Sequence, residues 1–113
     1  MRKITATVIT YNEADRIELC LKSLQGVADE IIVVDSFSSD NTLELCKRYD
    51  CIVTQRRFNG YGAQKQYAVS LSTNSYILSI DADEFLDEEH RQSIIALKRE
   101  GFTHRIYSLN RIN

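Results

Sequence analysis

Two carboxylates one residue apart, Asp81 and Asp83, are the side chains of this 113-residue chain best suited to chemistry. They follow an apolar run over residues 76–80 that predicts a buried strand. Such a pair can hold a hard divalent cation, which takes its other ligands from water and from substrate phosphates. The sequence therefore predicts a metal–diphosphate site, with an acidic loop that caps the next helix as the alternative.

The elements that must position this pair alternate between strand and helix. Apolar and β-branched runs predict strands over residues 4–10, 30–34, 51–54, 76–81 and 103–109. Apolar periodicity and capping residues predict helices over residues 14–25, 42–49, 62–71 and 88–99. This order predicts an α/β fold with a mostly parallel sheet and helices on both faces.

Polar clusters follow four of the predicted strands, over residues 11–13, 35–36, 56–57 and 81–83. Right-handed crossovers would bring the carboxyl ends of all these strands to one edge of the sheet. The segments that precede the strands look like ordinary connections. Because open α/β sheets bind ligands at the carboxyl ends of their strands, we expect the clusters to form one site.

Composition restricts the function classes that need to be considered. Hydrophobic residues make up 43% and charged residues 27%, as in ordinary globular domains, and the net charge of -2 argues against a nucleic-acid partner. Three cysteines without C-x-x-C spacing favour reduced thiols over zinc or a disulfide framework. No apolar run suggests a transmembrane segment or a signal peptide, and we expect a cytoplasmic protein.

Three segments resemble, in order, the signatures of family 2 glycosyltransferases of the GT-A fold: Thr10–Glu13, residues 33–42 and Asp81–Glu84. Residues 58–68 resemble the bacterial branch that adds sugars to the lipopolysaccharide core. The resemblance covers essentially the whole chain and implies a Rossmann-like GT-A sheet. It also implies that residues 1–113 are a truncated, N-terminal nucleotide-sugar-binding part, with the acceptor-binding part and the general base beyond residue 113.

The resemblance assigns roles to individual positions of this sequence. It implies nucleotide-binding residues at Thr10, Tyr11, Glu13, Asp35, Lys65 and Asp81, and a metal ligand at Asp83. Tyr11 would lie against the base, where an aromatic face can stack. Asp35 would sit at the base and ribose, and Asp81 at the ribose. Asp83 would hold Mn²⁺ or Mg²⁺ on the diphosphate, where the cation stabilises the leaving group.

The implied reaction transfers a sugar, with inversion, from a nucleotide-diphosphate donor to an acceptor hydroxyl. The acceptor would be a glycan or a lipid-linked sugar of cell-envelope or lipopolysaccharide biosynthesis, met at the inner face of a bacterial membrane. UDP is favoured by analogy, although Ser36 stands where many family members have a second aspartate. We expect the chain to be inactive by itself, and an exposed sheet edge would allow a homodimer.

Three other classes remain as alternatives. A non-catalytic nucleotide-binding or regulatory α/β module would carry its acidic residues after the first and third strands. A calcium loop would need glycine at Leu86 and glutamate at Gln92. A phosphatase-type nucleophile would follow the first strand. The first strand ends in Thr10, Tyr11 and Asn12, which counts against the regulatory module, and the acidic pair follows the fourth strand, which counts against the phosphatase. The calcium loop fails on its own residues, since Phe85 also stands at its fifth ligand position.

Seven further residues lie in or near the predicted site loops or carry titratable groups. Arg56 and Arg57 face either a diphosphate or the solvent. Phe58 and Tyr61 are expected to pack within their own loop. His90 and His104 are expected at the surface, and Glu84 stays an unassigned candidate for the general base.

Overall fold

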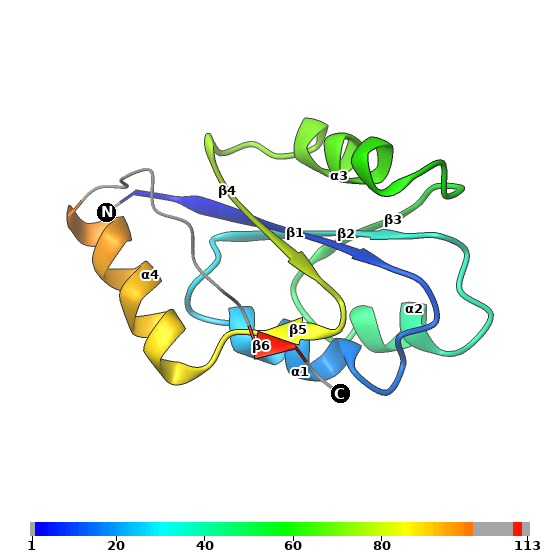
Figure 1. The fold of residues 1–113 in the computed structure, drawn as a ribbon, viewed down its shortest axis with the longest axis horizontal. Coiled ribbons are helices and arrows are strands. Elements are labelled where there is room, and N and C mark those ends of the chain that lie inside the picture. Colours follow the sequence, from blue (N-terminus) through cyan, green and yellow to red (C-terminus); the bar gives the residue numbers. More distant parts are fainter. Residues whose placement is uncertain (1, 101–109, 112–113) are drawn as a thin grey trace.

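A four-stranded parallel sheet forms the centre of the molecule in the computed structural model, which describes residues 2–100 and 110–111 (Figure 1). Its strands are β1 (Ile4–Thr10), β2 (Glu30–Asp35), β3 (Ile52–Gln55) and β4 (Tyr76–Asp81). They lie in the order β3-β2-β1-β4, and each neighbouring pair is parallel. The predicted parallel sheet is confirmed, and the four strands end at a common carboxyl edge.

Helices cover both faces of this sheet, as the sequence predicts. They are α1 (Ile17–Leu24), α2 (Thr42–Cys46), α3 (Tyr61–Ser70) and α4 (Glu88–Glu100). Figure 1 shows α3 alone above the sheet, with α1 and α2 below it. The larger apolar core lies on the α1 side and also takes in Ile94 of α4, whereas α3 covers a smaller core through Ala68. The sheet is therefore a middle layer that leaves its carboxyl edge open between the helices.

The apolar run of β2 shows why this strand lies inside the sheet. Ile31 and Val33 belong to the larger core, while Ile32 and Val34 belong to the smaller one. Alternate side chains of a strand point to opposite faces, so a strand that is apolar at every position is buried on both. The four predicted core residues of α1 are likewise fully buried: Ile17, Cys20, Leu21 and Leu24.

Most element boundaries agree with the prediction to within one residue, and the larger differences concern the first two helices and one added strand. The first helix begins at Ile17 rather than residue 14, because the amides of Arg16 and Ile17 both bond to the Glu13 carbonyl in a turn. The second ends at Cys46 rather than residue 49. Residues Glu84–Phe85 form an unpredicted strand, β5, which pairs antiparallel with β6 (Asn110–Arg111). The strand predicted over residues 103–109 lies outside the described residues.

Candidate functional site

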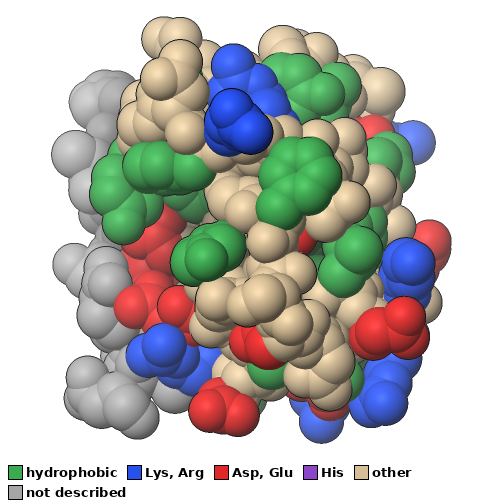
Figure 2. Space-filling view, turned by 90° about the vertical axis from the view of Figure 1, so that its right-hand side faces the viewer, with side chains coloured by type: hydrophobic (Ala, Val, Ile, Leu, Met, Phe, Trp, Pro, Cys, Tyr) green, Lys and Arg blue, Asp and Glu red, His purple; other side chains and the backbone are tan. Residues whose placement is uncertain are grey.

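A cavity of about 410 Å³ opens at the carboxyl edge of the sheet. The ends of β1, β2 and β4, the loop before α3 and the amino-terminal part of α3 supply its wall. The lining residues are Ile9, Thr10, Tyr11, Glu13, Ser36, Phe58, Tyr61, Gln64, Asp81, Ala82 and Asp83. Figure 2 views the molecule from this edge and shows exposed hydrophobic side chains gathered on it. Three of the four predicted polar clusters, all but the arginine pair, thus contribute side chains to one cavity.

The end of β1 supplies a buried hydroxyl and an exposed aromatic ring. Thr10 is 5% exposed, and its Oγ1 has no hydrogen-bond partner among the described residues. Tyr11 is 57% exposed, which leaves its ring free to meet a ligand. Glu13 also lines the cavity, but its carboxylate pairs with Arg16 at 2.7 Å. Thr10 and Tyr11 are therefore better placed than Glu13 to bind a ligand.

The end of β2 presents Ser36 to the cavity rather than Asp35. Asp35 is fully buried and is absent from the cavity wall. Its carboxylate accepts hydrogen bonds from the Ser38 amide at 2.9 Å, from the Ser38 hydroxyl, and from Gln55 Nε2 at 3.2 Å. In this structure Asp35 therefore orders the loop after β2, whereas Ser36 lies where a ligand can reach it.

The loops after β1 and β2 hold each other in place. Asn12 adopts a left-handed backbone, with φ 51°, which asparagine tolerates better than most residues. Its Oδ1 accepts from the Ser39 amide at 2.7 Å, and its own amide donates to Ser38 Oγ at 2.8 Å. These bonds fix the position of the adjacent Tyr11. This role of Asn12 is not among those predicted from the sequence, although asparagine is a residue that favours turns.

The acidic pair lies where β4 ends: Asp81 is the last residue of this strand, and Asp83 lies in the tight turn that leads to β5. Asp81 and Asp83 both line the cavity, and the buried Ala82 separates them. The Asp81 amide donates to the Glu84 carboxylate at 2.8 Å, so Glu84 shapes this turn and lies outside the cavity wall. Lys65 Nζ lies 3.9 Å from Asp81 Oδ1 but does not itself line the cavity. The structure thus places Lys65 beside the acidic pair, near the edge of the site.

A cation at this turn would need ligands from outside the protein. Within the described part of the chain, no three histidine, cysteine or acidic residues converge as a metal site. Two aspartates on one cavity wall fit Mg²⁺ or Mn²⁺, because these ions commonly use one or two carboxylates together with substrate phosphates and water. The residues present therefore fit a cation that binds together with a phosphorylated ligand.

Two aromatic residues and a glutamine form the wall on the α3 side. Phe58 and Tyr61 contact each other edge to face, with ring centroids 5.1 Å apart, as the packing prediction implies. They are nevertheless 48% and 69% exposed and line the cavity, so they also present a surface to a ligand. Gln64 is fully buried and was missed. Little in the sequence indicates that Gln64 is buried, since only its spacing of four residues from Ala68 places it on the buried face of α3.

The two arginines after β3 have separate roles. The guanidinium of Arg56 lies 4.9 Å from the centre of the Tyr67 ring and donates to Gln64 at 3.0 Å. Arg56 is therefore turned toward α3. Arg57 is exposed, as expected of a solvated loop residue.

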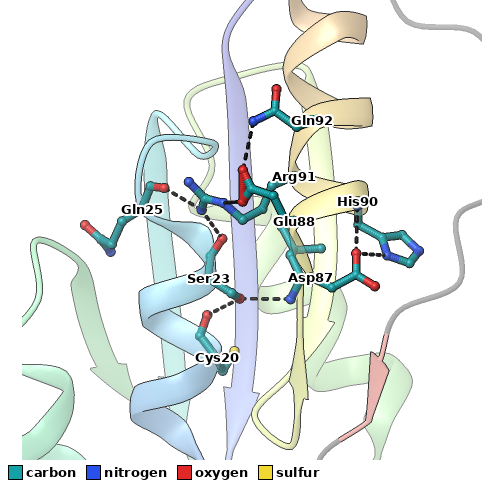
Figure 3. A network of polar contacts seen from close by, with 9 residues as sticks. Cys20, Ser23, Gln25, Asp87, Glu88, His90, Arg91 and Gln92 are labelled. Carbon is teal, nitrogen blue, oxygen red and sulfur yellow. Dashed lines mark hydrogen bonds and ion pairs between the residues drawn. The ribbon is translucent and has the colours of Figure 1, made fainter.

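A polar network fastens the segment after the acidic turn to α1 (Figure 3). Ser23 Oγ accepts from the Leu86 amide at 3.0 Å, and Arg91 Nη1 donates to the Ser23 and Gln25 carbonyls at 2.6 and 2.7 Å. His90, half-buried rather than at the surface, has Nδ1 2.7 Å from an oxygen of Asp87, the residue before α4. His104 lies outside the described residues. The network anchors α4 and the chain that leads from the acidic turn.

Comparisons with known proteins agree with this geometry. Residues 5–109 match the model of glycosyl transferase family 2. An uncharacterized glycosyltransferase of Rickettsia felis is 44% identical over 94 residues, which cover 83% of this chain and 33% of that protein. The lipopolysaccharide core biosynthesis glycosyltransferase LpsC of Rhizobium meliloti is 36% identical over 94 residues, which cover 79% and 34%. The chain thus spans about a third of the length of these relatives.

Solved structures show the same fold. Staphylococcus aureus TarS, residues 1–349, was solved with UDP and superposes with a TM-score of 0.74 at 28% identity, covering 87% of this chain and 32% of TarS. Glucosyl-3-phosphoglycerate synthase of Mycobacterium tuberculosis, solved with Mn²⁺, UDP and glucosyl-3-phosphoglycerate, gives a TM-score of 0.65 at 25% identity, covering 74% of this chain and 34% of that protein. The predicted GT-A fold is confirmed, and with the family match over residues 5–109 the chain belongs to glycosyl transferase family 2.

Proposed function

We propose that the chain binds the nucleotide-diphosphate part of a sugar donor, a UDP-sugar, for an inverting glycosyltransferase. The observation that carries the proposal is the cavity at the carboxyl edge, where Tyr11 and the two aspartates Asp81 and Asp83 share one wall. An aromatic face suits a base and a carboxylate pair suits a cation on a diphosphate. UDP in the structures of TarS and glucosyl-3-phosphoglycerate synthase supports the choice of nucleotide.

Each part of the cavity would then act on a different part of the donor. The ring of Tyr11 would stack on the base for about 1–3 kcal/mol. Asp81 would accept from a ribose hydroxyl, and Asp83 would hold Mn²⁺ or Mg²⁺. The bound cation would stabilise the negative charge that develops on the leaving diphosphate. Lys65, beside Asp81, adds positive charge near the same end of the cavity.

Transfer to an acceptor also needs a group that takes the proton of the attacking hydroxyl. We assign that base to no residue of this chain, and we propose that the chain supplies the donor-binding part of the enzyme. The likeness to LpsC supports an acceptor in cell-envelope glycan or lipopolysaccharide biosynthesis. We propose that the enzyme meets this acceptor at the cytoplasmic face of the membrane. In the described part of the chain, no helix has the length and apolar character needed to cross a bilayer.

Self-association is a separate part of the proposal. β3 and β4 are the edge strands of the described four-stranded sheet, and unpaired edge groups can pair with another copy. Sedimentation at increasing concentration should show a dimer, and a monomer throughout would refute this part alone.

Titration calorimetry of UDP into the chain, with and without Mn²⁺, tests the donor site. We expect binding that depends on Mn²⁺ and that Asp83→Asn abolishes, because the amide removes the charge that holds the cation. Asp50→Asn is the matched control, since Asp50 is exposed and lies before β3, at the opposite edge of the sheet. The proposal would be refuted if UDP bound neither with nor without Mn²⁺, or if the wild type and Asp83→Asn bound it equally.

A further inference from the structure

The acidic turn, residues 81–84, is held at its first residue from two sides. The Asp81 amide donates to the Glu84 carboxylate at 2.8 Å, so the side chain of Glu84 reaches back across the turn. The Asp81 carbonyl accepts from the buried thiol of Cys20 in α1, with the sulfur 3.7 Å from the oxygen. A thiol is a weak donor, whereas a carboxylate that accepts from a backbone amide makes a strong, charge-assisted bond. The bond to Glu84 is therefore the stronger of the two.

Helix α1 also fixes the chain beyond this residue. Ala82 is 2% exposed and belongs to the larger apolar core together with Cys20. The amide of Leu86 donates to Ser23 Oγ at 3.0 Å, and that hydroxyl donates to the Cys20 carbonyl at 2.7 Å (Figure 3). The chain is thus anchored to one helix before and after the turn, and the bond across the turn sets its path between these anchors.

Asp83 lies on that path, and it lines the cavity. A cation such as Mg²⁺ demands near-octahedral geometry, so the position of each carboxylate oxygen matters. Groups that hold metal ligands in place typically contribute roughly 10–100-fold to metal affinity. Glu84 lies outside the cavity wall in the described part of the chain, so it would act on a cation through the turn rather than by contact.

We propose that Glu84 positions Asp83 for the cation by holding the Asp81 amide, and that it is neither a metal ligand nor the general base. The inference rests on the proposed function, because it needs a cation and a diphosphate in the cavity. Asp83 is the residue that contacts the cation, whereas Glu84 is a positioning residue. This role requires an acceptor oxygen within reach of the Asp81 amide and requires no negative charge. A ligand or a base requires the carboxylate itself.

Two substitutions at Glu84 separate reach from charge. Glu84→Gln keeps the length of the side chain and an acceptor oxygen but removes the charge. Glu84→Asp keeps the charge, but its carboxylate is one methylene shorter and falls short of the Asp81 amide. We therefore expect Glu84→Gln to behave nearly as the wild type does, and Glu84→Asp to behave as Glu84→Ala does. A metal ligand or a general base would be impaired by Glu84→Gln.

Calorimetric titration of UDP into the full chain, with Mn²⁺ present, measures these effects. Glu84→Ala and Glu84→Asp should bind UDP about tenfold more weakly than the wild type, because Asp83 is no longer held for the cation. Glu84→Gln should lose no more than about threefold, since the charge that it removes is screened by solvent and salt. Rescue by glutamine together with failure of aspartate is the pattern that the positioning role predicts.

Hydrogen exchange in the metal-free chain tests the same bond without any ligand. The Asp81 amide should exchange about tenfold faster in Glu84→Ala and Glu84→Asp than in the wild type and Glu84→Gln. Glu30→Ala is the matched control, because the Glu30 carboxylate accepts from the Thr73 amide at 3.0 Å at the opposite edge of the sheet. This control should leave the exchange of the Asp81 amide and the affinity for UDP as they are. Thermal melting establishes that each variant is folded, and Glu84→Gln and Glu84→Asp decide the matter if Glu84→Ala is not.

The outcomes separate this inference from the function on which it rests. A wild type that binds no UDP in the presence of Mn²⁺ refutes both. If the wild type binds UDP, an equal affinity of Glu84→Asp overturns the inference and leaves the donor site intact. A Glu84→Gln variant that binds UDP as weakly as Glu84→Asp overturns it as well, because charge rather than reach would then be needed.

Discussion

Replacing Ser23 by alanine should lower the free energy of unfolding by about 2 kcal/mol. Ser23 is 8% exposed, and its hydroxyl accepts from the amide of Leu86, which is 3% exposed. Alanine leaves that buried N–H without a partner, at a cost of about 1–3 kcal/mol. The lost bond from Ser23 Oγ to the Cys20 carbonyl, 2.7 Å long, adds to this cost. The loss should move the melting temperature down by roughly 8 °C in a chain of this size.

Urea unfolding followed by circular dichroism measures this effect in a chain that has no tryptophan. The matched control is Ser70→Ala, because the hydroxyl of Ser70 also donates to a carbonyl of its own helix but is exposed. Both variants gain the same small helix propensity of alanine, so their difference isolates the buried bond. We expect Ser70→Ala to change the free energy of unfolding by less than about 0.5 kcal/mol. Equal destabilisation by the two substitutions would refute the argument from the buried amide.

Three further effects can be measured on the same chain. Lys98→Met should lower the free energy of unfolding in urea by about 3 kcal/mol. The buried ammonium of Lys98 lies 2.8 Å from the Asp29 carboxylate and donates to the Val27 carbonyl at 2.7 Å, and methionine can replace neither contact. The Thr73 amide holds the pKa of Glu30 below its ordinary value of 4.5, so this stabilisation is present above pH 4.5 and lost on further acidification. The melting temperature of the wild type should therefore fall between pH 5 and pH 3, and that of Glu30→Gln should fall less. An equal fall of melting temperature in the two proteins would contradict this. Burial raises the pKa of Cys46 to about 12 and that of Cys20 further, so neither thiol should react with a disulfide reagent at pH 8 until urea is added.

Strands and helices whose apolar residues recur at regular spacing are predicted well from the sequence. The apolar run of β2 and the spacing of Ile17, Cys20, Leu21 and Leu24 in α1 depend only on which faces are buried. The shared edge of the sheet then follows from the alternation of strands and helices. This is why the positions of Asp81 and Asp83 on the cavity wall could be anticipated without coordinates.

The details of the site depend on partners that are distant in sequence. Asp35 and Ser36 are adjacent polar residues at a strand end, and alternation sends only one of them toward the cavity. The buried one, Asp35, needs donors, and Gln55 of β3 supplies one of them. Gln64 can be buried only because Arg56 satisfies its amide. β5 is two residues long and depends on a strand near residue 110, which no local pattern reveals.

Polar groups at the two edges of the sheet differ in whether the protein itself supplies their hydrogen-bond partners. At the amino edge, Glu30 accepts from the Thr5 hydroxyl and from the Thr73 amide, so the protein itself supplies the partners. At the carboxyl edge, the hydroxyl of Thr10 is buried and finds no partner within residues 2–100 and 110–111, and the Tyr11 ring is exposed. An unpaired buried hydroxyl costs about 1–3 kcal/mol, a cost that a ligand recovers when it bonds there. Part of the affinity for the proposed donor would therefore be present in the free protein as unsatisfied hydrogen-bonding capacity, where the parallel strands end.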